Sequence, residues 1–128
     1  MPFDAPYETP FGDIELLTDA RRRISNRKTW VQGSFQDGDR HCLVAALSLA
    51  CGSRSFHVPN RTEKRLARLI AKQIPQDAPF MTRCRLIPAR KRLMSLNDDP
   101  RTTHENVMAL FDWTISRLAN TAPISVPA

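Results

Sequence analysis

The sequence predicts an all-α fold, a single compact domain of about five helices with room for a short hairpin near residues 30–42. Two observations favour this class. Apolar residues recur in several segments at the three-to-four-residue spacing of a buried helix face, and alternating β-branched runs are few. A chain of 128 residues, of which 41% are hydrophobic, can bury a stable core without disulfides or a structural metal. We divide it into an N-terminal arm (1–9), a helical domain (10–119) and a flexible tail (120–128).

The first predicted helix runs from Pro10 to Ser25, with Thr9 as its N-cap. A turn at Asp37-Gly38 follows. The next helix is expected from about His41 to Cys51, closed by Gly52. Because this second helix is apolar on nearly every side, we expect it at the centre of the domain.

The third helix is predicted from Arg61 to Ile74, capped by Asn60 and ended by Pro75. Residues 75–87 read as irregular. A fourth helix, Pro88 to Leu96, should point Arg90, Lys91 and Arg92 outward.

The last helix, residues 102–119, has the clearest signals. Thr102 and Glu105 form an expected capping box. A regular apolar stripe follows, made of Val107, Leu110, Phe111, Ile115 and Leu118.

The net charge of +6 comes from one segment, because residues 61–92 hold ten Lys/Arg against Glu63 and Asp77, a net of +8. Such a segment is typical of contact with nucleic acid or an acidic protein, although a solvated basic face would look the same. The candidate binding residues are Arg61, Lys64, Arg65, Arg68, Lys72, Arg90, Lys91 and Arg92. Arg83 and Arg85 could extend the set. No helix-turn-helix, zinc-knuckle or RNA-recognition signature accompanies it.

Cys42 is the sharpest candidate for chemistry. A thiol at a helix N-terminus can have a lowered pKa, and His41 or His104 could act as its base, oriented by Asn97 or Asp98. The alternative is a small buried hydrophobe, which is the commoner role of a cysteine followed by an apolar run.

The run Asn97-Asp98-Asp99 precedes the last helix and has two interpretations. It can fix that loop through backbone hydrogen bonds, or it can form a polar pocket beside Trp30 and Gln32. The indole N–H of Trp30 will need a partner if the ring is buried.

Metal-ligand spacing is absent, and we expect neither a metal site nor a cofactor. The candidate ligands, which include no C-x-x-C or H-x-x-x-H pair, are His41, Cys42, Cys51, His57, Cys84 and His104. With no secretory signal and no apolar membrane span, we expect a cytoplasmic protein with reduced cysteines and no membrane contact. A homodimer would be compatible with this composition.

Three short motifs resemble a family of small bacterial proteins known as domain of unknown function 6197. They are Trp30-x-Gln32-Gly33, Cys42-Leu43-x-x-Ala46-Leu47, and a third that contains Asn97, Asp98, Pro100, Arg101, Thr102 and Glu105. The sequence departs from the family's pattern at Ala45, where a glycine is expected, at Leu96, where an aromatic residue is expected, and by one residue fewer after Pro100. The resemblance spans residues 14–119, although 52–95 add almost nothing to it. It implies no activity, but it does imply that Trp30, Cys42, Asn97 and Asp98 lie together.

The sequence therefore favours a non-enzymatic interaction module with a basic face at residues 61–92. The alternative is a small cysteine-dependent hydrolase or transferase that uses Cys42.

Overall fold

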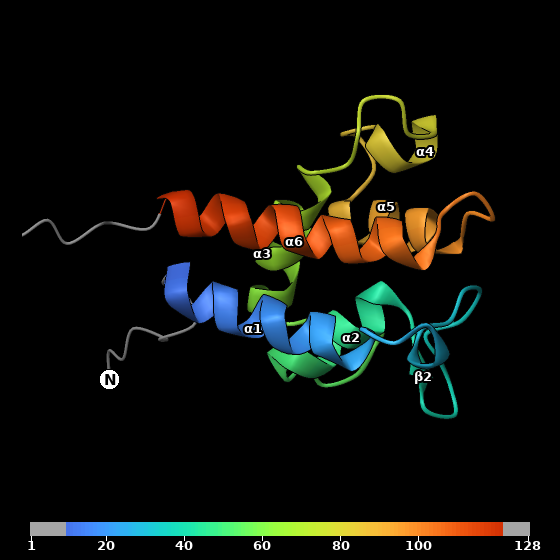
Figure 1. The fold of residues 1–128 in the computed structure, drawn as a ribbon, viewed down its shortest axis with the longest axis horizontal. Coiled ribbons are helices and arrows are strands. Elements are labelled where there is room, and N and C mark those ends of the chain that lie inside the picture. The colour runs from blue at the N-terminus through green and yellow to red at the C-terminus, as the bar shows by residue number, and fades with distance from the viewer. Residues whose placement is uncertain (1–9, 122–128) are drawn as a thin grey trace, which may run out of the picture.

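Six α-helices, a short 3-10 helix and a two-stranded hairpin make up residues 10–121, the part of the chain that the computed structural model describes (Figure 1). The elements in chain order are α1 (Pro10–Arg23), η2 (Arg27–Thr29), β1 (Gln36–Asp37), β2 (Arg40–His41), α2 (Leu43–Cys51), α3 (Arg61–Ala71), α4 (Phe80–Arg83), α5 (Ala89–Asp98) and α6 (His104–Thr121). The predicted all-α class is confirmed. The predicted arm (1–9) and residues 122–128 of the predicted tail lie outside the described residues.

Helix α2 lies at the centre of the fold, as its all-round apolar sequence predicted. Leu43, Val44 and Leu47 are fully buried. Gly52 ends the helix in the left-handed conformation, with φ of 69°, a region that favours glycine. Three helices pack against α2, namely α1, α3 and α5.

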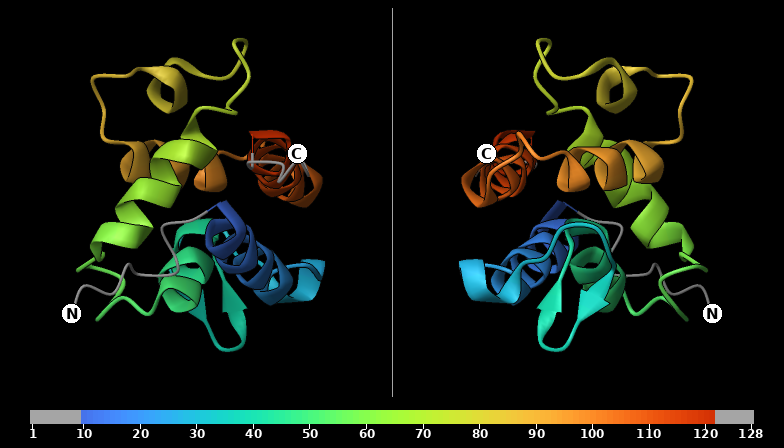
Figure 2. Two further views of the ribbon diagram at one scale, coloured as in Figure 1. Left: turned by 90° about the vertical axis from the view of Figure 1, so that its left-hand side faces the viewer. Right: turned by 90° about the vertical axis from the view of Figure 1, so that its right-hand side faces the viewer.

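The helices form two layers, which Figure 2 shows edge-on. One layer holds α1, α2 and the hairpin, and the other holds α5 and α6. Helix α3 runs obliquely between them and packs on α5, while α1 packs on α6 across the core. The buried apolar faces of α1 (Leu17, Ala20 and Ile24) and α6 (Val107, Leu110 and Phe111) close this core.

The short hairpin near residues 30–42 is confirmed. Gln36 pairs with His41, and Asp37 pairs with Arg40, in an antiparallel register. Gly38 occupies the turn with φ of 63°, as expected for an Asp-Gly turn.

The helix ends differ from the prediction by one to three residues, and two local predictions were wrong. Residues 75–87 are not wholly irregular, because Pro79 introduces the four-residue helix α4. The predicted capping box of Thr102 and Glu105 was wrong by one residue. Thr103 caps α6 instead, since its Oγ1 accepts from the Asn106 backbone N–H at 3.1 Å while Asn106 Oδ1 accepts from the Thr103 N–H at 2.8 Å. An amide three residues after the cap makes the same reciprocal pair as a carboxylate.

Across residues 10–121, none of the helices combines the length and apolarity required to cross a membrane.

Candidate functional site

The Asn97 side chain, fully buried at the end of α5, joins three segments of the chain. Its Oδ1 accepts from the Trp30 indole N–H at 2.7 Å and from the Leu43 backbone N–H at 3.1 Å. Its Nδ2 donates to the Val31 carbonyl and to Asp98 Oδ1, each at 3.0 Å. One amide therefore links the end of α5 to the start of α2 and to the segment after η2.

Gln32 and Gly33 complete this contact, and we call the set Trp30, Gln32, Gly33, Asn97 and Asp98 the Asn97 cluster. Gln32 Nε2 donates to the carbonyls of Asn97 and Asp99 at 2.8 and 2.9 Å, which satisfies groups left open where α5 ends. The Gly33 N–H donates to Asp98 Oδ1 at 2.9 Å. These contacts agree with the first interpretation of the Asn97-Asp98-Asp99 run, in which it fixes the loop before the last helix.

A hollow of about 300 Å³ lies beside the Asn97 cluster. It is lined by Gly33, Ser34, Phe35, Cys42, Met94 and Asp98. Trp30, Cys42, Asn97 and Asp98 therefore lie together, as the family resemblance implied.

Cys42 is buried, with 3% of its surface exposed, and caps α2 through its sulfur. Its Sγ accepts from the Ala45 backbone N–H at 3.3 Å. Burial raises the pKa of the Cys42 thiol, and the nearby Asp98 charge adds to this, against the opposing effect of the Ala45 and Val44 N–H groups. A Cys42 nucleophile would need the helix N-terminus to lower this pKa, but desolvation outweighs the backbone donors, in agreement with the interpretation of Cys42 as a small buried side chain.

Neither candidate base forms a hydrogen bond with the Cys42 thiol among the described residues. His104 is buried on α6, and its Nε2 lies 2.6 Å from the Ile24 carbonyl oxygen. His41 is partly buried on β2, and burial together with the Arg23 charge lowers its pKa. Within residues 10–121, no hydrogen bond joins Cys42 to either histidine, and Asn97 orients neither ring.

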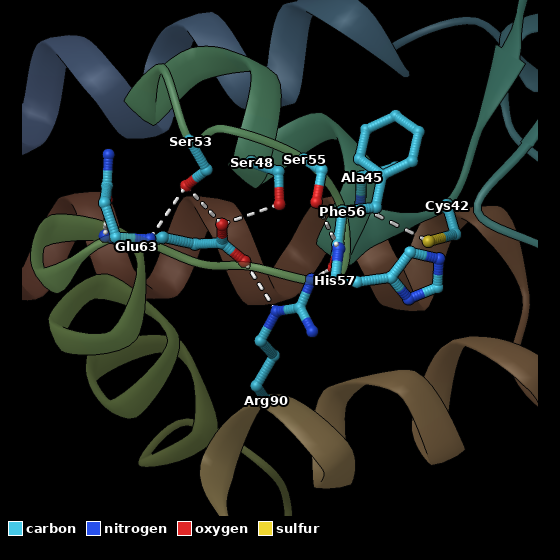
Figure 3. Close-up of polar contacts among 10 residues, drawn as sticks. Cys42, Ala45, Ser48, Ser53, Ser55, Phe56, His57, Glu63 and Arg90 are labelled. Atoms are coloured by element: carbon cyan, nitrogen blue, oxygen red, sulfur yellow. Dashed lines mark hydrogen bonds and ion pairs between the residues drawn. The ribbon is translucent and has the colours of Figure 1, made fainter.

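A second buried polar group centres on Glu63 of α3, which has no exposed surface (Figure 3). Its Oε1 accepts from the hydroxyls of Ser48 and Ser53, each at 2.6 Å. Its Oε2 pairs with Arg90 Nε at 2.6 Å, and Arg90 also donates to the Phe56 carbonyl. We call Ser48, Ser53, Glu63 and Arg90 the Glu63 cluster. It ties α2, α3 and α5 together.

The prediction that Arg90 points outward was wrong, because its side chain is only 17% exposed and turns toward Glu63. A signal for this was present in the sequence. Glu63 shares the helix spacing of Leu66, Ala67 and Ile70, so it belongs to the buried side of α3 and needs a buried cation.

Arg65 also differs from the prediction, since it does not belong to an unpaired basic face. Its guanidinium makes a bidentate ion pair with the buried Asp13 of α1, at 2.6 and 2.9 Å. The remaining predicted cations lie at or near the surface, without an ion pair to any acidic residue between 10 and 121. They are Arg61, Lys64, Arg68, Lys72, Lys91 and Arg92.

Most of these cations line two adjoining hollows. The first, about 520 Å³, contains six cations from four parts of the chain: Arg68, Lys72, Arg83, Arg85, Arg92 and Arg117. The second, about 460 Å³, shares Arg68, Arg85 and Arg92 with it and adds Lys64, Arg90 and Lys91. No Asp or Glu from the described part of the chain lines either hollow.

We call these side chains, without the paired Arg90, the basic surface. It consists of Lys64, Arg68, Lys72, Arg83, Arg85, Lys91, Arg92 and Arg117. Arg117 was not predicted, because it comes from α6 and only the fold brings it to the segment 61–92. Arg61 is exposed but lines neither hollow.

The described residues hold no group of three or more His, Cys, Asp or Glu side chains placed to bind a metal ion. The three cysteines are free thiols.

Residues 9–117 match the sequence pattern of the Family of unknown function (DUF6197). The chain belongs to this family. The match covers the Asn97 cluster, the Glu63 cluster and every cation of the basic surface, with Arg117 as its last residue. No curated protein and no solved structure matches the chain. Membership in DUF6197 assigns no activity to the chain.

Proposed function

We propose that this protein is a non-enzymatic interaction module that binds nucleic acid through its basic surface. The observation that carries the proposal is the hollow of about 520 Å³ lined by six cations, with no acidic side chain of the described residues in its wall. Like charges held this close repel one another, and a bound polyanion relieves that repulsion.

The kind of cation favours phosphate as the ligand. Five of the six cations in the first hollow are arginines. The planar guanidinium matches phosphate oxygens with two parallel N–H donors, and it remains charged at any physiological pH. Two of them are already held in place, since Arg83 Nε donates to the Ala78 carbonyl at 2.9 Å and Arg92 Nε donates to the Ile87 carbonyl at 3.0 Å. Held side chains lose less entropy when a ligand binds.

The continuity of the two hollows favours a chain of phosphates over a single anion. Arg68, Arg85 and Arg92 line both, so cations extend without interruption from Lys64 to Lys72 along α3. A nucleic-acid backbone offers regularly spaced charges to such a row. An acidic protein is the second partner that this charge could recognise. Because the cysteines are free thiols, which suit a reducing compartment, we propose a cytoplasmic location.

A charge-reversal pair tests the proposal. Arg68 and Arg85 are exposed and line both hollows, so Arg68→Glu/Arg85→Glu should abolish binding of a labelled oligonucleotide, measured by fluorescence anisotropy. The matched control is Arg27→Glu/Lys28→Glu, which alters two exposed cations of η2 and lowers the net charge by the same four units. The control should keep most of the affinity.

Salt dependence gives the second readout. Binding of the wild type should weaken steeply as salt rises, so that log K falls with log salt. Each lost phosphate contact should make this negative slope shallower by about 1. Equal effects of the two charge-reversal pairs would contradict a localised site. Tighter binding of poly-glutamate than of an oligonucleotide of equal charge would replace nucleic acid with an acidic protein as the partner.

A further inference from the structure

Apolar side chains stand exposed within the stretch that supplies two cations of the basic surface. Phe80, Met81 and Leu86 are 60%, 57% and 94% exposed, while Arg83 and Arg85 lie between or beside them. A phosphate backbone makes no favourable contact with apolar side chains, and their exposure to water is unfavourable in free energy. They indicate a ligand that presents apolar surface next to its charges.

Phe80 makes a cation–π contact with its neighbour Arg83. The Arg83 guanidinium lies over the Phe80 ring, 5.7 Å from the ring centroid, and is itself held by its bond to the Ala78 carbonyl at 2.9 Å. The ring nevertheless remains 60% exposed. An aromatic ring held beside arginines is the arrangement on which nucleic-acid bases stack.

The shape of the basic surface excludes the usual way of reading a duplex. A double helix is read by a protruding helix that enters its major groove. Here the cations of α3 face hollows that are walled by residues of α5, α6 and the segment 83–85, so α3 does not protrude on this side. Helix α4, with four residues, is too short for that role. Hollows of about 520 and 460 Å³ suit single nucleotides, since pockets of this size hold ligands of similar bulk.

We infer that the ligand of the basic surface is single-stranded nucleic acid, with its phosphates against Arg68, Arg85 and Arg92 and an unpaired base stacked on Phe80. This inference rests on the proposed function and specifies its substrate class. Base stacking is tolerant of sequence, so the protein should bind single strands with weak sequence preference.

The test compares a labelled pyrimidine single strand of about 16 nucleotides with a duplex of the same length, by fluorescence anisotropy on the full chain. Wild type should bind the single strand more tightly. Phe80→Ala should weaken single-strand binding roughly 5- to 150-fold, the loss of one stacked base, and leave the salt slope unchanged. Phe80→Tyr should restore affinity. Phe11→Ala is the matched control, because Phe11 is 64% exposed on α1 and lines neither hollow of the basic surface.

The outcomes separate the two proposals. Salt-dependent binding that favours the duplex, or a Phe80→Ala loss no larger than that of Phe11→Ala, overturns this inference and leaves the proposed function standing. If neither probe shows salt-dependent binding, the proposed function is overturned and this inference with it. Since Phe80 is exposed, circular dichroism should show that both alanine variants keep the wild-type fold.

Discussion

The Asn97 cluster and the basic surface use their polar groups in opposite ways. In the Asn97 cluster, both ends of the Asn97 amide are bonded within the protein, to partners as far apart in sequence as Trp30 and Leu43. In the basic surface, eight cations face solvent or open hollows without an ion pair inside residues 10–121. The contacts of the Asn97 cluster therefore hold separate segments of the fold together. The cations without a carboxylate partner come from residues 64–92 and, at Arg117, from α6.

The Glu63 cluster sharpens this comparison because it lies within the basic segment itself. Arg90 and Arg65 come from the same run of cations as Arg68 and Arg92, yet each is paired with a buried carboxylate. A count of charges in the sequence does not separate the paired arginines from the unpaired ones. The burial of the partner carboxylate separates them.

The largest effect on stability is expected for Glu63→Ala. This change leaves the Arg90 guanidinium buried without its partner and should lower the free energy of unfolding by about 3–5 kcal/mol in urea denaturation. Glu105→Ala, at an exposed carboxylate of α6, is the control and should change it by less than about 0.5 kcal/mol. The double variant Glu63→Met/Arg90→Met should recover part of the loss. A loss below about 1 kcal/mol for Glu63→Ala would contradict a structural role.

Asn97→Ala should have the next largest effect. It removes the partners of the partly buried Trp30 indole N–H and the buried Leu43 N–H, at about 1–3 kcal/mol for each unsatisfied group. We expect a loss of at least about 2 kcal/mol by the same measurement, with salt-dependent binding retained by the folded fraction. Asn97→Asp keeps one accepting oxygen but sets a second, buried carboxylate oxygen against the Val31 carbonyl and Asp98 Oδ1, so it should destabilise the fold at least as much as Asn97→Ala. Asn120→Ala, at an exposed position, is the control. Reduced binding with unchanged stability would show that the Asn97 cluster itself contacts the ligand.

A smaller effect is expected on the rate at which the Cys42 thiol is alkylated. Because burial raises the pKa of this thiol, it remains protonated at neutral pH, and alkylation by iodoacetamide should be more than about tenfold slower than in the unfolded chain. The alkylation rate should rise only at pH values above the ordinary pKa range of a thiol. Mass spectrometry of the native protein across pH 5 to 9 measures it. Fast alkylation with an apparent pKa below about 8.5 would instead support Cys42 as a nucleophile.

The sequence predicted the helices well because their signals are local. Caps such as Asn60, the turn at Asp37-Gly38 and the end at Gly52 depend on neighbouring residues alone. It also predicted that Trp30 and Asn97 meet, through the family resemblance. Pairings across the fold escaped it. Arg65 with Asp13 and Arg90 with Glu63 join different helices. The helix spacing of Glu63 indicates a buried carboxylate that needs a cation, but nothing in the local pattern shows which arginine supplies it.

The most direct test of the central claim locates the binding site on the protein. We propose to titrate ¹⁵N-labelled protein with the unlabelled single strand and to follow backbone N–H and arginine Nε–H signals by nuclear magnetic resonance. The shifts should concentrate on Arg68, Arg85 and Arg92 and on the backbone of residues 80–86, and they should disappear at high salt. Shifts centred on the Trp30 indole and the Gly33 N–H would contradict the account, because they would place the ligand at the Asn97 cluster.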